Sequence, residues 1–206
     1  MLRETILNIL DNVWPMLVII CTIVISLRVV WIIQNKQKVT FYKEVFSLGF
    51  IIYVICLFHT VTFQDVGWST SNFIPFKEML RYNFGSPLFI RNVLGNVLMF
   101  IPYGFFITYL FKFKKWRTPF LLTLILSVVI ETTQLMIGRV FDIDDIFLNL
   151  IGGSLGYFLF ALLDDMKKHF PPLLKKAYIY NIIVIVFIII VILYLLEVIE
   201  VGGNAL

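Results

Sequence analysis

The segment 131–156, ETTQLMIGRVFDIDDIFLNLIGGSLG, places polar and charged residues between two long apolar stretches. It contains the charged and polar residues Glu131, Gln134, Arg139, Asp142, Asp144, Asp145 and Asn149. A polar or ionised group in hydrocarbon is costly unless it has a partner. We therefore expect this segment to carry the function and the rest of the chain to form its frame.

The composition is that of a multi-pass membrane protein. Of the 206 residues, 60% are hydrophobic and 15% are charged, with a mean hydropathy of +0.95; soluble domains carry about 25% charged residues. The net charge of +4 could suit nucleic acid, but the basic residues cluster beside apolar stretches, which is typical of membrane topology. We expect no nucleic-acid partner. Cys21 and Cys56 lie inside apolar stretches and predict neither a disulfide framework nor a metal site.

Long apolar stretches predict an all-α helix bundle that forms a single membrane domain over residues 1–206. A helix needs about 20 apolar residues to cross a bilayer, and helices satisfy their own backbone groups in lipid. Six stretches qualify: 13–33, 45–63, 90–111, 119–138, 145–163 and 178–196.

The distribution of Lys and Arg predicts the orientation. The first, third and fifth connections hold eleven: Lys36, Lys38, Lys43, Lys112, Lys114, Lys115, Arg117, Lys167, Lys168, Lys175 and Lys176. The opposite side holds five: Arg3, Lys77, Arg81, Arg91 and Arg139. Arg28 lies near the first-loop end of its helix and can extend to that side. The positive-inside rule then puts both termini and the 139–145 turn outside the cytoplasm.

Spacing predicts a polar pocket that opens outward between the third, fourth and fifth spans. Asn92 and Asn96 are four residues apart, and Glu131 and Gln134 are three apart, so each pair shares a helix face. At 1.5 Å per residue, Asn96, Glu131 and Asn149 lie about 9, 10 and 6 Å below the outer helix ends. The predicted pocket comprises Arg91, Asn92, Asn96, Glu131, Gln134, Arg139, Asp142, Asp145 and Asn149. Pro102 predicts a kink in the third span.

The acids allow more than one interpretation. Asp142, Asp144 and Asp145 could bind a divalent cation through oxygen ligands, or Asp144 or Asp145 could cap the fifth span. A buried Glu131 must pair with Arg91 or Arg139 or be protonated. It is therefore the candidate for direct ligand or proton chemistry, with a structural arginine–glutamate clamp as the alternative.

The connection 63–89 is longer than a simple turn requires. Phe73, Ile74 and Phe76, followed by Lys77 and Arg81, suit a short interfacial or re-entrant segment, with apolar groups in the membrane and cations at head groups.

RNVLGNVLMFIPYG (91–104), the pair Glu131 and Gln134, and RVFDIDDIFLNLIGGSLG (139–156) together resemble the VanZ-like family of bacterial membrane proteins. The resemblance covers 72–160, with 13–63 and 178–196 as peripheral transmembrane helices. Its most specific part is R-x-x-D-x-x-D-x-x-x-N-x-x-G, matched by Arg139, Asp142, Asp145, Asn149 and Gly152. The resemblance implies a protein of the bacterial cell membrane that lowers susceptibility to teicoplanin without altering the peptidoglycan precursor target.

These observations favour a non-enzymatic protein that binds an amphiphile at the outer leaflet. Its expected partners are membrane lipids and either a lipoglycopeptide antibiotic or a lipid-linked cell-wall precursor, whose phosphate or carboxylate Arg91 and Arg139 could bind. The alternative is an intramembrane hydrolase or transferase with Glu131 as acid and base, or a flippase. No nucleotide-binding pattern is present, and no cofactor is expected beyond the divalent cation. The oligomeric state is left open.

Overall fold

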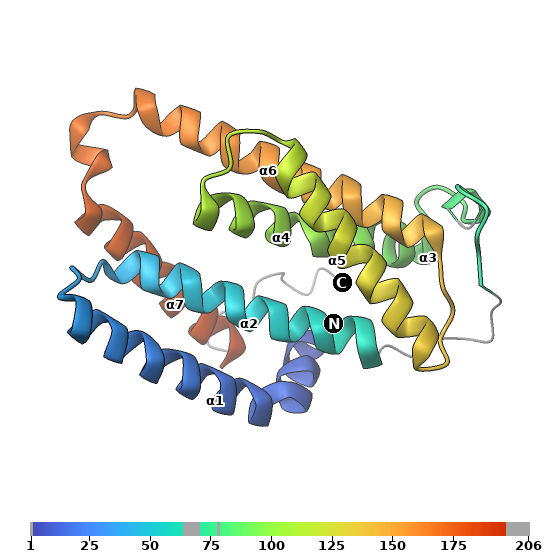
Figure 1. Ribbon diagram of the computed structural model, residues 1–206, viewed down its shortest axis with the longest axis horizontal. Coiled ribbons are helices and arrows are strands. Elements are labelled where there is room, and N and C mark those ends of the chain that lie inside the picture. Colours follow the sequence, from blue (N-terminus) through green and yellow to red (C-terminus); the bar gives the residue numbers. More distant parts are fainter. Residues whose placement is uncertain (1, 64–70, 78, 197–206) are drawn as a thin grey trace, which may run out of the picture. The chain divides into compact units, whose positions relative to one another are not determined.

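The computed structural model describes residues 2–63, 71–77 and 79–196, and most of them are helical (Figure 1). The helices are α1 (Leu2–Asn35), α2 (Phe41–Phe63), η1 (Met79–Arg81), α3 (Pro87–Phe89), η2 (Ile90–Leu94), α4 (Gly95–Phe111), α5 (Arg117–Met136), α6 (Ile143–His169), η3 (Pro172–Lys175) and α7 (Ala177–Leu195). Within those residues, the β structure is an isolated parallel bridge between Asn72 and Asp142. The all-α prediction is confirmed.

Six helical stretches are long and apolar enough to cross a membrane: Arg3–Asn35, Phe41–Thr62, Pro87–Phe111, Arg117–Met136, Ile143–His169 and Ala177–Leu195. This confirms the expected membrane helix bundle. Two helices extend furthest beyond their predicted ends. α1 already begins at Leu2, and α6 continues to His169. The residues added at the end of α6, DDMKKH (164–169), are polar but include the helix formers Met and Lys, so hydropathy falls before the helix ends.

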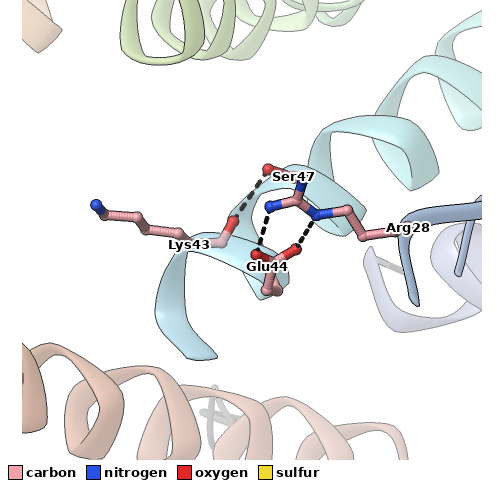
Figure 2. Close-up of polar contacts among 4 residues, drawn as sticks. All are labelled: Arg28, Lys43, Glu44 and Ser47. Atoms are coloured by element: carbon pink, nitrogen blue, oxygen red, sulfur yellow. Dashed lines mark hydrogen bonds and ion pairs between the residues drawn. The ribbon is translucent and has the colours of Figure 1, made fainter. Parts of the chain in front are cut away.

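The described residues form two compact units, one of which contains α1, α2 as far as Cys56, and α7. In this unit Arg28 and Glu44 make a bidentate ion pair between α1 and α2, with Nε–Oε2 and Nη2–Oε1 distances of 2.9 and 2.8 Å (Figure 2). The guanidinium also lies 4.7 Å from the centroid of the Trp31 ring. Arg28 therefore has a protein partner and does not merely extend toward the first loop.

The second unit runs from Leu57 to Lys168 and contains α4, α5 and α6, which lie side by side (Figure 1). Glycines allow α6 to approach its neighbours closely. A Cβ added at Gly152 would overlap Val97 O of α4, one at Gly156 would overlap Ile101 O of α4, and one at Gly153 would overlap the side chain of Thr123 of α5. Such small residues let membrane helices pack backbone to backbone. α6 is therefore the central helix of this unit.

The third span is not one regular helix. Its first residues form α3, a π-helical turn η2 follows, and α4 begins at Gly95, whose N–H bonds to Ile90 O. Because this turn is wider than an α-helical one, it breaks the register that was expected to place Asn92 and Asn96 on one face. Pro102 lies inside α4, which continues as a helix on both sides of it. The irregularity thus precedes the proline.

Candidate functional site

The turn between α5 and α6 sets the position of the acids. α5 ends in a Schellman motif, in which Gly138 adopts φ +83° and the N–H groups of Gly138 and Arg139 bond to Leu135 O and Gln134 O. α6 then begins at Ile143. The carboxylate of Asp142 accepts the N–H of Asp144 at 2.9 Å, so Asp142 is the N-cap. The prediction that Asp144 or Asp145 caps this helix was wrong.

Asp144 is almost fully buried and holds the segment before α3 against the start of α6. One carboxylate oxygen accepts the N–H of Phe76 and the other accepts the N–H of Met79 at 3.1 Å. Phe76 has φ +66°, which is unusual for a bulky side chain. Asn72 adds a side-chain bond to Asp142 at 2.9 Å and the parallel bridge. Asp144 is therefore an anchor for residues 71–77 and Met79.

Backbone and amide donors thus already use Oδ1 of Asp142 and both carboxylate oxygens of Asp144. Across the described ranges there is no group of three or more His, Cys, Asp or Glu side chains placed to hold a metal ion. A divalent cation at Asp142, Asp144 and Asp145 stays a prediction.

Glu131 is 2% exposed and lies on the buried face of α5. Its Oε2 accepts the N–H of Asp142 at 2.9 Å. Arg139, Asp142 and Asp145 are close enough to act on its charge. No ion pair of Glu131 occurs among the residues that the structure describes, so the expected clamp with Arg91 or Arg139 is replaced by a bond to a backbone amide.

Polar side chains of α6 connect it to both neighbouring helices. Asp145 accepts a hydrogen bond from the Asn96 amide of α4. One helical turn further along, the Asn149 amide donates to Ser127 of α5 at 2.8 Å, where both residues are buried. We call the residues Asn96, Ser127, Glu131, Asp142, Asp145 and Asn149 the polar layer. It brings together side chains from the three spans that were predicted to contribute them.

The remaining predicted site residues lie outside these contacts. Gln134 and Arg139 both donate to Val61 O near the end of α2, Gln134 at 2.8 Å. The buried Nε of Arg139 has no hydrogen-bond partner within the described residues. Arg91 is exposed and Asn92 is half-buried, both on the π-helical turn, and neither side chain makes a hydrogen bond within the described part of the chain. The predicted set is therefore brought together only in part.

Sequence reasoning missed Asn72, Ser127 and Val61. Ser127 carried a usable signal, because the buried residues of α5 recur every four positions and are all small or polar: Pro119, Thr123, Ser127 and Glu131. That period marks one helix face. Val61 contributes a backbone carbonyl, which every residue has, so its identity carried no signal.

Comparisons with known proteins identify the family of the chain. A family model described as VanZ/LLP1 matches residues 45–164. "Protein VanZ" of Enterococcus faecium is 36% identical over 74 residues, which cover 35% of this chain and 45% of that relative. The chain thus spans less than half the length of the curated relative. No solved structure matches the chain. The matched range includes most of α2, which was not part of the core expected from the motifs.

Proposed function

Because the chain belongs to the VanZ/LLP1 family, we propose that it is a bacterial cell-membrane protein that lowers susceptibility to lipoglycopeptide antibiotics such as teicoplanin. In this proposal it acts without catalysis, by binding an amphiphile from the outer leaflet at the polar layer. The match to Protein VanZ supports the phenotype. The proposal also takes both termini and the turn before α6 to lie outside the cytoplasm, which the distribution of Lys and Arg supports.

The observation that carries the proposal is the uncommitted hydrogen-bonding capacity within the polar layer. Within the described residues, the buried Nε of Arg139 has no hydrogen-bond partner. Glu131 and Asp145 beside it each accept one hydrogen bond, through Oε2 and Oδ1. A buried polar atom left unpaired costs about 1–3 kcal/mol. A ligand that supplies the missing hydrogen bonds would recover this free energy. Three acidic groups near one arginine favour a ligand with hydrogen-bond donors or positive charge.

The test is antibiotic susceptibility in a susceptible Gram-positive host. Expression of the unaltered chain should raise the inhibitory concentration of teicoplanin more than that of vancomycin. Glu131→Gln and Asp145→Asn should lose most of this gain, because each removes a charge while keeping the side-chain size. Asp164→Asn, an exposed acid near the end of α6, is the matched control and should behave as the original chain. Unchanged tolerance to teicoplanin with inserted, folded protein would contradict the phenotype.

A second candidate is an acid–base reaction on a lipid-linked cell-wall intermediate, catalysed by Glu131. It is favoured by one observation: a 2% exposed carboxylate whose neighbours are mostly acidic, an environment used to hold a proton for transfer. Purified chain in bilayers that contain a prenyl-diphosphate-linked substrate should then release product, and Glu131→Gln should abolish the release. Absence of turnover with the unaltered chain, with or without Mg²⁺, would leave binding as the function.

A further inference from the structure

The described part of segment 71–85 leaves large apolar side chains uncovered. Phe73, Phe76, Leu80 and Phe84 are 65%, 52%, 83% and 92% exposed. Each of the three phenylalanine rings nevertheless packs against another ring. Phe73 stacks on Phe141 and Phe76 on Phe147, with centroids 5.3 and 5.5 Å apart, and Phe84 lies 5.0 Å from Phe89. These side chains are held in place while much of their surface faces outward.

The attachment of this segment places it at the boundary of the membrane. The Asn72–Asp142 bridge and the bonds from Phe76 and Met79 to Asp144 fix it to the first turn of α6. It also leads directly into the helical stretch that starts at Pro87. Both α6 and that stretch are candidate spans, so the segment lies where two spans enter the bilayer. Exposed rings at this depth can enter the boundary between head groups and acyl chains.

The charges of the segment indicate which kind of lipid head group it would bind. Lys77 and Arg81 are exposed and sit between the apolar residues. Over residues 71–91 the sequence contains three cations, Lys77, Arg81 and Arg91, and one acid, Glu78. Each Lys or Arg near an anionic bilayer is attracted to its head groups. A loop that faced only water would gain nothing from exposing the apolar side chains of this segment.

We propose that Phe73, Phe76, Leu80 and Phe84, together with Lys77 and Arg81, form an interfacial platform that inserts its apolar side chains into the bilayer surface and binds anionic phospholipid head groups. The platform requires only that α4 and α6 cross a membrane, so it stands apart from the proposed antibiotic phenotype. The leaflet that it occupies is the one on which these two spans begin.

The test measures depth and lipid preference in full-length chain. Cys21 and Cys56 are replaced by alanine, and a fluorophore is attached at Leu80→Cys or, as an aqueous control, at Gln37→Cys in the exposed first connection. The protein is reconstituted into phosphatidylcholine vesicles, with or without phosphatidylglycerol, that contain lipid with a nitroxide near the head group. We expect quenching at position 80 to exceed that at position 37 at least twofold, and to increase when phosphatidylglycerol is present.

Lys77→Gln/Arg81→Gln should remove the increase caused by phosphatidylglycerol while the quenching in phosphatidylcholine persists. Helical circular dichroism and a single peak in size exclusion confirm that each variant is folded. Quenching at position 80 no stronger than at position 37 would overturn insertion. A phosphatidylglycerol response that survives the double substitution would overturn binding of head groups by these two cations.

Discussion

Asp144 is the residue whose local role is most directly testable. Asp144→Ala removes the acceptor of two backbone N–H groups and should free residues 71–79 from α6. Hydrogen bonds to charged groups contribute about 1.5–3 kcal/mol each, so trypsin should cleave after Lys77 at least about tenfold faster, equivalent to about 1.4 kcal/mol. Asp144→Asn keeps one acceptor oxygen, so its cleavage rate should lie between those of the unaltered chain and Asp144→Ala. Asp164→Asn serves as the control, and equal cleavage rates for all chains would contradict the anchor.

The hydrogen bond between Asn149 and Ser127 is a second prediction at this scale. A double-mutant cycle of Asn149→Ala and Ser127→Ala should give a coupling free energy of about 0.6–1.7 kcal/mol, the range found for hydrogen bonds between membrane helices. Unfolding in bicelles measures it. Thr133 bonds to its own helix at Val129 O, so the matched cycle of Asn149→Ala with Thr133→Ala should give no coupling. Equal coupling in both cycles would show that the bond is not specific.

At the residue scale, the sequence predicted which side chains lie close together better than it predicted their partners. Residue type and spacing indicated that Asn96, Glu131, Asp145 and Asn149 converge, and the described contacts bring them together. Their roles were harder to foresee because several partners are backbone groups. Glu131 bonds to an amide where an arginine was expected, and Asp142 took the capping role expected of its neighbours.

At the scale of elements, the contact of α4 with α6 depends on glycine. In Gly104→Ala the added methyl would overlap the backbone of Gly153, so the two helices must separate, at a cost of about 1–3 kcal/mol typical of overpacking. Thermal unfolding in detergent should show the lower stability. Gly49 is also helical but has no atom within 4 Å of an added Cβ, so Gly49→Ala should be neutral or stabilising. A stable Gly104→Ala would mean that the helices have room to move apart freely.

Element positions followed well from hydropathy, since every predicted span corresponds to a helical stretch. The π-helical turn at Ile90–Leu94 was not predicted. The turn contains no unusual residue type. It is defined by its backbone hydrogen bonds, which the composition does not reveal. For the same reason the sequence could not show that Asn92 leaves the face that Asn96 occupies.

At the scale of the whole molecule, the predicted orientation in the membrane can be checked by labelling single cysteines on intact cells. In chain with Cys21 and Cys56 replaced by alanine, Asn83→Cys should react with an impermeant maleimide on intact cells. Lys38→Cys, Lys114→Cys and Lys175→Cys should react only after permeabilisation, because the positive-inside rule predicts that the basic connections lie in the cytoplasm. All four positions are exposed. The opposite labelling pattern would place the polar layer on the cytoplasmic side, where it could not bind an antibiotic that stays outside the cell as proposed.

The ion pair of Arg28 with Glu44 has a consequence for biogenesis. Each side chain would meet the translocon as an unpaired charge near the end of its helix if that helix entered lipid alone, and an unpaired charge makes insertion of a helix less favourable. Their bidentate contact across the first connection favours release of α1 and α2 into the bilayer together, as a preassembled hairpin. Glycosylation-site mapping of nascent chains should then show that Glu44→Gln impairs integration of α1, although the substitution lies in the following helix.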